Sequence, residues 1–277
     1  MKVRIATCAK MPEPDADEAP LADALTRAGL AFDLLAWDDP AADWDAPIAT
    51  VLRTTWNYAQ HLDAFSAWLA RVAAVAPLYN PLDVVRGNLR KRYLLELASR
   101  GVPVVPTTLV ERGGSVDLSR SAAKFVIKPE VGAGSWLARV FEPGDPDAPA
   151  HLAKVTAVGA ALVQPYMSSV DSYGERSLVW IDGELSHAIR KSPRFSGDSE
   201  SVTGPFAIAD DERAVATAAL ASVADRILYG RVDLARDDAG RPMVMELELV
   251  EPSLFFARRD GSADRFVAGL ARRIRNA

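Results

Sequence analysis

Short apolar runs alternate with amphipathic stretches in the first part of the chain. Val3–Thr7, Phe32–Trp37 and Ile48–Arg53 have the length and the apolar content of buried strands. In Leu21–Ala28 and Asp63–Val75, apolar residues recur at the spacing of one helix face. Strands and helices in this alternation are typical of a parallel βαβ layer, so the pattern predicts an N-terminal α/β subdomain.

The rest of the chain mixes helices with strands that stop at proline and with hairpins, which indicates an α+β arrangement. We therefore expect an α/β (α+β) protein with subdomains at residues 1–82, 83–164 and 165–277. The predicted elements are helices at Asp83–Arg100, Ala148–Val158, Asp210–Leu228 and Asp264–Arg275, strands at Phe125–Lys128 and Leu162–Gln164, and hairpins of Ser177–Ile181 with Glu184–Ile189 and of Arg231–Arg236 with Met243–Leu249.

The amino-acid composition excludes several classes of protein and of partner. A chain of 277 residues that is 49% hydrophobic and 25% charged is long enough for more than one core, and it is neither disordered nor fibrous. Its 32 basic and 37 acidic residues give a net charge of -5, which offers no long-range attraction to nucleic acid or to an anionic membrane. We expect neither as a partner, and the composition leaves open whether the chain forms a homo-oligomer.

The few cysteines and histidines favour an intracellular protein and disfavour a zinc enzyme. The single cysteine, Cys8, excludes an intrachain disulfide, and three scattered histidines offer no zinc-ligand spacing. The apolar run at the start of the sequence is too short and too charged for a signal peptide, and no run reaches the roughly 18 residues of a membrane span. These features predict a cytoplasmic protein.

The second predicted hairpin is the most informative segment. Because strand side chains alternate between faces, Arg231 shares a face with Asp233, and Glu246 shares one with Glu248. Direct pairing places Asp233 opposite Glu246 and Arg231 opposite Glu248. Converging carboxylates repel one another, so their surroundings either raise a pKa or supply cations, and a magnesium-nucleotide site would supply the cations. An ordinary solvated sheet face is the equally supported alternative.

Lysines and a small-residue loop form a second candidate group. Lys128 ends a strand and precedes Gly132-Ala133-Gly134-Ser135, so an ammonium and several backbone N–H groups could surround a polyphosphate. The loop is neither a Walker A sequence nor a complete dinucleotide fingerprint, and a plain tight turn is the alternative. Lys91 lies on a cationic helix face, which is ordinarily solvated. Backbone groups of Gln164-Pro165-Tyr166-Met167 could meet an adenine edge, or could simply end a strand.

Taken in order, these residues resemble the ATP-grasp superfamily of ligases. The specific part is Arg231-x-Asp233 followed after twelve residues by Glu246-x-Glu248. The resemblance implies an ATP-grasp fold, in which an N-terminal Rossmann-like subdomain is followed by two α+β subdomains that clasp ATP. It also implies that Lys91 and Lys128 bind ATP phosphates, that residues 132–135 close over them, and that residues 164–167 hold adenine.

The resemblance implies a metal site as well. Asp233, Glu246 and Glu248 match the acidic ligands of Mg²⁺, with Mn²⁺ as the alternative ion. One residue departs from the family pattern, because Glu248 stands where the superfamily usually has asparagine. A second glutamate still coordinates magnesium but adds negative charge, so the number of ions and the role of Arg231 are left open.

The activity implied is ATP-dependent ligation of a carboxylate to an amine or a related nucleophile. An acyl phosphate would form on a small amino-acid-like substrate, with release of ADP and phosphate, and Arg231 would stabilise that intermediate. Arg190 and Lys191 begin a basic segment, up to Asp198, that is expected to act as a lid over the phosphates. Glu175 is expected to meet the ribose or the nucleophile, with an ordinary exposed loop acid as the alternative.

Substrate recognition is expected to involve the N-terminal subdomain. Arg53 follows a predicted strand and could bind a substrate carboxylate in a two-pronged manner, with Trp56 and Tyr58 as walls. A surface arginine and two packing aromatic residues are the equally supported alternative. Residues 53–58 and 246–256 are most similar to the ATP-grasp branch that contains the cyclo-ligase forming cycloserine from O-ureidoserine. Ring closure is therefore the first alternative activity, and a small-molecule kinase or a non-catalytic ATP-binding protein are the others.

Overall fold

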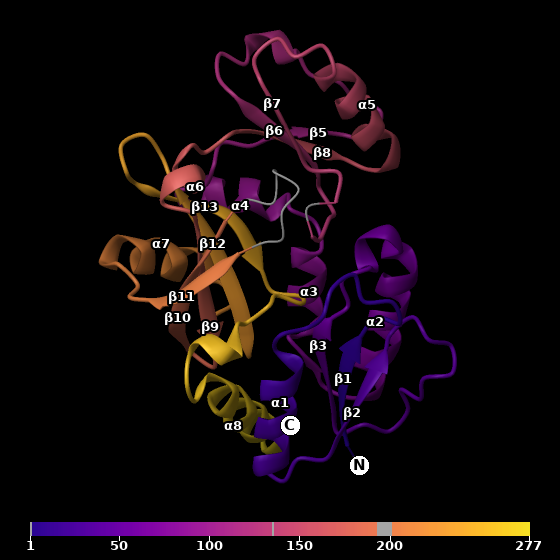
Figure 1. Cartoon of the computed structure of the whole chain (residues 1–277). Coiled ribbons are helices and arrows are strands. Elements are labelled where there is room, and N and C mark those ends of the chain that lie inside the picture. Colours follow the sequence, from indigo (N-terminus) through magenta and orange to yellow (C-terminus); the bar gives the residue numbers. More distant parts are fainter. Residues whose placement is uncertain (1, 135, 193–200) are drawn as a thin grey trace.

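The N-terminal part of the chain forms a parallel sheet with a helix on each face. The computed structural model describes residues 2–134, 136–192 and 201–277, and its strands β1 (Val3–Thr7), β2 (Phe32–Ala36), β3 (Ala49–Thr54) and β4 (Leu78–Tyr79) are ordered β2-β1-β3-β4. Helix α1 (Glu18–Arg27) packs on Val3 and Ile5, whereas α2 (Leu62–Val75) packs on Ala6. Because neighbouring strand residues face opposite ways, the two helices cover opposite faces. The predicted βαβ layer is confirmed (Figure 1).

A second, antiparallel sheet follows, and it lies at the top of the view in Figure 1. Its strands are β5 (Thr108–Val110), β8 (Ala161–Pro165), β6 (Phe125–Pro129) and β7 (Arg139–Phe141), in that spatial order. Helix α5 (Ala148–Val158) covers one face through Leu152 and Val155, which join Phe125 and Ile127 in a core of their own. Leu162 of β8 joins a larger core cluster instead, together with residues of the C-terminal part of the chain such as Val232 and Leu247.

The third sheet carries the predicted hairpins. Its spatial order is β11 (Val202–Phe206), β10 (Glu184–Lys191), β9 (Glu175–Ile181), β12 (Tyr229–Arg236) and β13 (Pro242–Glu248). Pairing of β12 with β13 places Asp233 beside Glu246 and Arg231 beside Glu248, so the predicted register is confirmed. The register shifts immediately after Asp233, at a bulge in the ladder.

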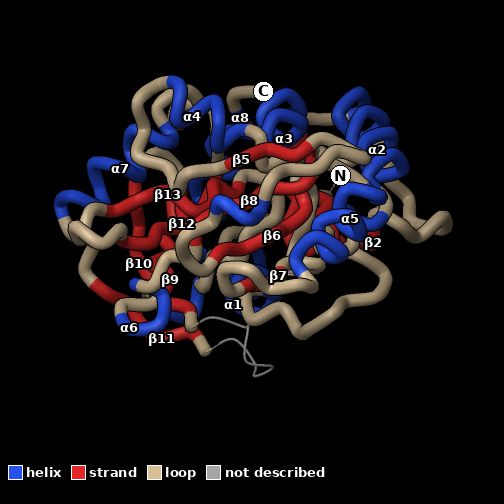
Figure 2. The backbone as a smooth tube through the Cα atoms, turned by 90° about the horizontal axis from the view of Figure 1, so that it is seen from above, coloured by secondary structure: helices blue, strands red, loops and turns tan. Residues whose placement is uncertain are grey.

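Helices surround these sheets, as the view from above in Figure 2 shows. One core cluster mixes Val3 of β1 with Val179 of β9 and Phe266 of α8, so the N-terminal sheet and the third sheet are packed together. The remaining elements are helices α3 (Leu82–Asn88), α4 (Tyr93–Ser99), α6 (Ser169–Ser172), α7 (Asp210–Leu220) and α8 (Ser262–Arg275), and short 3₁₀ turns η1 (Tyr58–Gln60), η2 (Leu118–Arg120) and η4 (Phe256–Arg258). Within the described ranges, no helix has both the length and the apolar character that a membrane crossing requires.

Two helix predictions need correction. The helix predicted over Asp83–Arg100 is broken into α3 and α4, because the Lys91 backbone N–H donates instead to the Glu130 carbonyl oxygen at 2.9 Å. Arg90 and Arg92 also pair with the buried Glu130 carboxylate. The helix predicted over Asp210–Leu228 ends at Leu220, and turns lead from it into β12.

Candidate functional site

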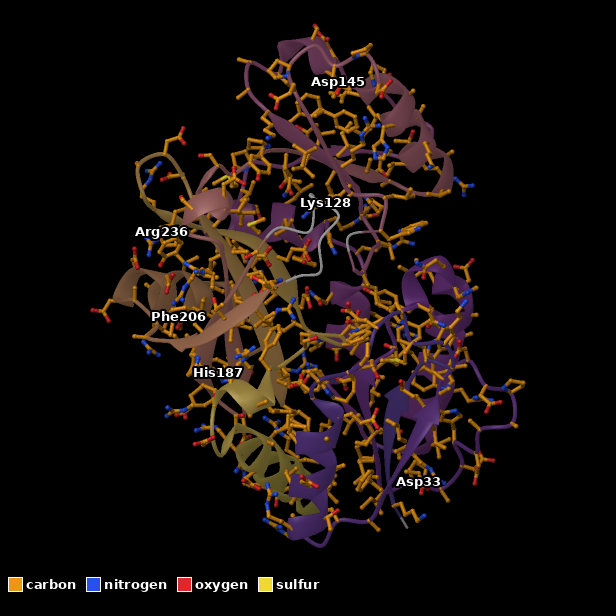
Figure 3. All side chains as sticks on the ribbon, viewed as in Figure 1. Asp33, Lys128, Asp145, His187, Phe206 and Arg236 are labelled. Carbon is orange, nitrogen blue, oxygen red and sulfur yellow. The ribbon has the colours of Figure 1, made fainter. Side chains whose placement is uncertain are left out.

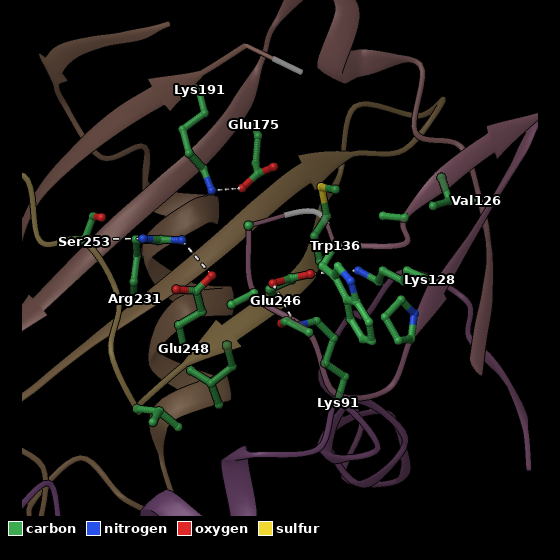
Figure 4. A pocket seen from close by; sticks show the side chains of 18 of the residues that line it. Lys91, Val126, Lys128, Trp136, Glu175, Lys191, Arg231, Glu246, Glu248 and Ser253 are labelled. Carbon is green, nitrogen blue, oxygen red and sulfur yellow. Dashed lines mark hydrogen bonds and ion pairs between the residues drawn. The ribbon is translucent and has the colours of Figure 1, made fainter. Parts of the chain in front are cut away.

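A cavity of about 570 Å³ lies where the three sheets approach one another, and Figure 4 shows it from close by. Figure 3 places Lys128 at the junction between the β5–β8 sheet and the rest of the molecule. Most of the predicted site residues line this cavity: Trp56, Tyr58, Lys91, Lys128, Gly132, Ala133, Gly134, Gln164, Pro165, Tyr166, Met167, Glu175, Lys191, Arg231, Glu246 and Glu248. Ser135 lies outside the described residues.

Glu246 joins the two lysines that were predicted to bind phosphate. Its Oε1 accepts a hydrogen bond from Lys128 Nζ at 2.9 Å, and its Oε2 lies 3.4 Å from Lys91 Nζ. Burial alone would raise the pKa of the Glu246 carboxyl, but the charges of Lys128 and Lys91 lower this pKa to about 2. Glu246 is therefore ionised at neutral pH. It pairs with Lys91 of the α3–α4 connection and with Lys128 of β6.

Asp233 is the most enclosed acid of the hairpin, with 1% of its surface exposed. Arg231 donates to its two oxygens from Nε at 2.8 Å and from Nη2 at 2.9 Å, and Lys191 Nζ donates to Oδ2 at 2.9 Å. Burial favours the neutral acid, but Arg231 and Lys191 hold the pKa of Asp233 well below its usual range. This carboxylate is charged and is fixed between two cations.

Arg231 bridges the hairpin and the segment that follows it. Its Nη2 also donates to Glu248 Oε1 at 2.7 Å, and its Nη1 donates to the Ser253 carbonyl oxygen at 3.1 Å (Figure 4). Burial raises the pKa of Glu248 even though Arg231 opposes the shift. The predicted juxtaposition of acids beside one guanidinium is present, and each of these acids has a cationic partner.

Glu175 begins β9, where it lies opposite Lys191 of β10 and forms an ion pair with it. Burial raises the pKa of Glu175 to about 7, although the Lys191 charge lowers it. The alternative of an ordinary exposed loop acid is therefore wrong. Figure 4 shows the pair at the edge of the cavity.

The predicted lid needs a correction in its first residues. Arg190 and Lys191 belong to strand β10, so their side chains point to opposite faces. Lys191 lines the cavity, whereas the Arg190 guanidinium lies over the Phe206 ring, 5.8 Å from its centroid. Residues 193–198 of the predicted lid lie outside the described residues.

Arg53 lies behind the cavity wall, and it is buried with only 2% of its surface exposed. Its Nη2 lies 3.2 Å from Asp17 Oδ2, and its guanidinium stacks over the Tyr229 ring. The alternative of a surface arginine is therefore wrong. Asp17 also accepts backbone N–H groups of residues 254–256 at 2.5 to 3.1 Å. The Arg53–Asp17 pair thus anchors the segment after β13 to the N-terminal subdomain.

Lys91 also holds the small-residue loop, because its Nζ donates to the Gly132 carbonyl oxygen at 2.9 Å. Gly134 has a φ of 58°, in the left-handed region that favours glycine. At the end of β8, the Gln164 side chain donates to Thr107 Oγ1 at 2.8 Å. The Tyr166 hydroxyl donates to Asp171, and burial raises the pKa of Tyr166.

Sequence reasoning missed several residues that line the cavity, notably Glu251, Ser253, Phe255 and Trp136. Glu251 is 8% exposed, and burial together with the charge of Glu248 raises its pKa to about 8. Its place in the run Glu246-x-Glu248-x-x-Glu251 was the available signal. Trp136 directly follows the small-residue loop and stands between Lys91 and Lys128 in Figure 4.

The hairpin acids fit a hard divalent cation by the chemistry of their donor atoms. Glu246 and Glu248 keep 23% and 28% of their side-chain surface exposed, and both face the cavity. All the predicted ligands offer carboxylate oxygen, which Mg²⁺ prefers. Across the described ranges, however, no three or more His, Cys, Asp or Glu residues lie together in a group that could hold a metal ion. The hairpin acids form ion pairs with lysines and with Arg231 instead.

Comparison with known proteins gives a consistent picture. Residues 3–80 match the family model of the D-cycloserine synthetase DcsG N-terminal domain. The cycloserine biosynthesis protein DcsG of Streptomyces lavendulae is 38% identical over 94% of this chain and 95% of that protein. A crystal structure of D-cycloserine synthetase DcsG superposes with a TM-score of 0.90 at 36% identity, covering 99% of this chain and 100% of that one.

More distant structures share the fold alone. The ATP-grasp ligase PsnB, in complex with a minimal precursor, Mg and ADP, superposes with a TM-score of 0.64 at 15% identity. The superposition covers 99% of this chain and 98% of the PsnB chain. The ATP-grasp architecture therefore extends over the whole chain and is not confined to the cavity.

Proposed function

The chain belongs to the DcsG family of ATP-grasp ligases, and on this premise we propose that it uses ATP to close a ring within one amino-acid-like substrate. The observation that carries the proposal is that Lys91, Lys128 and Arg231 meet Glu246 and Glu248 of hairpin β12–β13 in one cavity. The proposed subdomains, residues 1–82, 83–164 and 165–277, each contribute a wall to it.

The nucleotide half of the site lies between β6, β8 and the hairpin. We assign the ATP phosphates to Lys91, Lys128 and the backbone of residues 132–134, and adenine to residues 164–167. Asp233, Glu246 and Glu248 would hold Mg²⁺, which supplies neutralisation of phosphate charge when it is bound. The PsnB complex contains Mg and ADP, which supports the same ligands here. In the structure these acids and lysines neutralise one another, so ligand binding would exchange their partners.

The proposed chemistry has two steps. An oxygen of the substrate carboxylate attacks the terminal phosphorus of ATP, and ADP leaves, giving an acyl phosphate. A nitrogen at the other end of the same molecule then attacks the acyl carbon, the C–O bond to phosphate breaks, and the nitrogen loses its proton as orthophosphate leaves. Holding both ends of one molecule in place makes the second step intramolecular, which favours it strongly over an encounter between two molecules.

The chain's own residues position and neutralise the reacting groups. The Arg231 guanidinium lines the cavity and would stabilise the negative charge that develops on the acyl group. Lys191, on β10 of the same sheet, adds a second cation that Asp233 orients. Trp56 and Tyr58 line the end of the cavity that would hold the substrate. Arg53 lies behind these residues and pairs with Asp17. Glu175 remains a candidate for the ribose.

The experiment combines product and phosphate analysis. The protein is incubated with ATP, Mg²⁺ and O-ureidoserine, and ADP, orthophosphate and the organic product are measured over time. We expect ADP and orthophosphate in equal amounts, together with a cyclic product lighter than O-ureidoserine by one water. If the oxygen-bound ureido nitrogen closes the ring, hydrolysis of its carbamoyl group would consume a water and release carbon dioxide and ammonia. A stable phosphorylated product would indicate a kinase, ADP formation only with an added amine would indicate an intermolecular ligase, and binding of ATP without turnover would indicate a non-catalytic protein.

A further inference from the structure

Glu251 lies in the wall of the cavity, beyond the end of β13. Its backbone carbonyl oxygen accepts a hydrogen bond from Trp56 Nε1 at 3.3 Å, which ties it to the N-terminal residues at the substrate end. Arg231 donates to the carbonyl oxygen of Ser253, two residues further along the chain. The segment that carries Glu251 is therefore fixed from two sides, and its side chain belongs to the substrate half of the cavity.

The Glu251 carboxyl group has no cation of its own. In the part of the chain that the structure describes, no ion pair within 4.0 Å and no hydrogen bond involves its carboxyl oxygens. The nearby cations are engaged elsewhere: Lys91 with Glu246, Arg231 with Asp233 and Glu248, and Arg53 with Asp17. Glu251 differs in this respect from Glu175, Glu246 and Glu248, which each face a lysine or an arginine.

Burial without a counter-ion is unfavourable for a carboxylate. Only 8% of the Glu251 surface is exposed, and the charge of Glu248 adds repulsion. The pKa of Glu251 is accordingly raised to about 8. A cationic ligand group that enters this end of the cavity would supply the missing charge and restore ionisation.

We propose that Glu251 binds the ammonium group of a zwitterionic substrate while Arg231 faces its carboxylate. The ammonium and carboxylate groups of an α-amino acid are both attached to the α-carbon, so an acid and a guanidinium in one cavity wall match the pair. The inference rests on the proposed function and assigns the residue that selects α-amino acids over acids that lack the amino group. Glu251 is thus a specificity-determining residue.

The test compares Glu251→Gln with the unaltered protein on O-ureidoserine and on its analogue without the α-amino group. Glutamine keeps the size of the side chain and removes the charge. A charge-assisted hydrogen bond is worth about 10- to 100-fold in affinity. We therefore expect KM and the calorimetric Kd for O-ureidoserine to rise about 10- to 100-fold, with KM for ATP and both constants for the analogue unchanged.

Glu13→Gln is the matched control, because Glu13 lines the same cavity but is exposed. Solvent screening should make its effect on either compound small. Equal losses for both compounds in Glu251→Gln, no loss at all, or a selective loss in Glu13→Gln instead would overturn the assignment. If the unaltered protein forms no ADP with O-ureidoserine, the proposed function fails. Calorimetry with serine and with 3-hydroxypropanoate then decides the ammonium site by the same comparison.

Discussion

Lys128 Nζ lies 2.9 Å from Glu246 Oε1, and this ion pair joins β6 of one sheet to β13 of another. The two residues are 118 positions apart in the sequence, and both face the cavity. The β5–β8 sheet has an apolar core of its own, and its Leu162 also packs in the cluster that contains Leu247 of β13, so this ion pair adds to an apolar contact between the sheet and the hairpin. A bound nucleotide would compete with Glu246 for the lysine.

Replacing Lys128 with alanine is expected to weaken nucleotide binding. The variant loses one charge-assisted contact to phosphate, which corresponds to a Kd for Mg·ATP about 10- to 100-fold higher. Isothermal titration calorimetry measures the change. Lys154→Ala is the matched control, since Lys154 is an exposed lysine on α5 of the same unit. Equal affinity of the Lys128 variant and the unaltered protein would contradict the phosphate assignment.

Glu246→Gln is expected to change the magnesium requirement without unfolding the protein. The carboxylate is 23% exposed in the cavity wall, and glutamine retains its shape. Loss of a charged oxygen ligand should raise the Mg²⁺ concentration for half-maximal turnover, or abolish turnover, because Mg²⁺ prefers carboxylate oxygen. Turnover titrated with MgCl₂, alongside urea unfolding, separates the two effects. An unchanged magnesium titration would remove Glu246 from the metal site.

Asp233→Asn is expected to cost both activity and stability. The Asp233 carboxylate is 1% exposed and compensates Arg231 and Lys191, so asparagine would leave buried cations without their partner. Breaking a buried pair of this kind destabilises a protein by about 3–5 kcal/mol. Urea denaturation should show that loss, and Glu246→Gln should show little of it. A fully stable Asp233→Asn protein would contradict this account of the network.

The hairpin chemistry was predictable because it depends on local alternation. The faces of Arg231 and Asp233, and their partners across the turn, follow from a period of two and the position of the turn. Strands β5, β7 and β11 were not predicted, because their short or mixed sequences form strands only by pairing with β8, β6 and β10.

Other features depend on residues far away in the sequence. The break between α3 and α4 requires Glu130, and the burial of Arg53 requires Asp17, 36 residues away. No helical or strand pattern encodes such pairs. The run of acids after Glu246 pointed to Glu251, but its lack of a cation could not be predicted, since it is a property of the assembled cavity.

Glu175 and Glu251 are expected to contribute less to the free energy of unfolding as the pH rises from about 5 to 8. The pKa of Glu251 is raised to about 8 and that of Glu175 to about 7, whereas an unperturbed glutamate titrates near 4.5. Over this range these two carboxyl groups bind more protons in the folded protein than in the unfolded chain. The stabilisation is therefore complete below pH 4.5 and is lost as the pH passes the folded-state values.

Urea titrations at several pH values measure this slope, which amounts to at most about 1.4 kcal/mol per pH unit for each group. Glu248 raises the Glu251 pKa, whereas Lys91, Arg231 and Arg53 lower it. Glu251→Gln should flatten the decline between pH 7 and 8, since glutamine does not titrate. A slope identical to that of the unaltered protein in this window would contradict the raised pKa.

Asn80→Ala is expected to destabilise the contact between the N-terminal and C-terminal parts of the chain. Asn80 is fully buried, and its Nδ2 donates to the carbonyl oxygens of Tyr229 and Leu249, both at 2.8 Å. Its Oδ1 accepts the Leu228 backbone N–H at 2.8 Å. Alanine would leave these backbone groups without that partner, and each unsatisfied buried group costs about 1–3 kcal/mol. Thermal and urea unfolding should show a loss of about 3 kcal/mol or more.

The matched control for this substitution is Asn276→Ala, at the exposed C-terminal end of α8. Its side chain lies outside the packed interface, so unfolding should change by no more than about 0.5 kcal/mol. Leu249 directly follows β13, so loss of its hydrogen bond to Asn80 should also increase the mobility of the cavity wall. We expect KM for the substrate to rise more than KM for ATP. Equal stability of the two variants would show that Asn80 does not join the two parts of the chain.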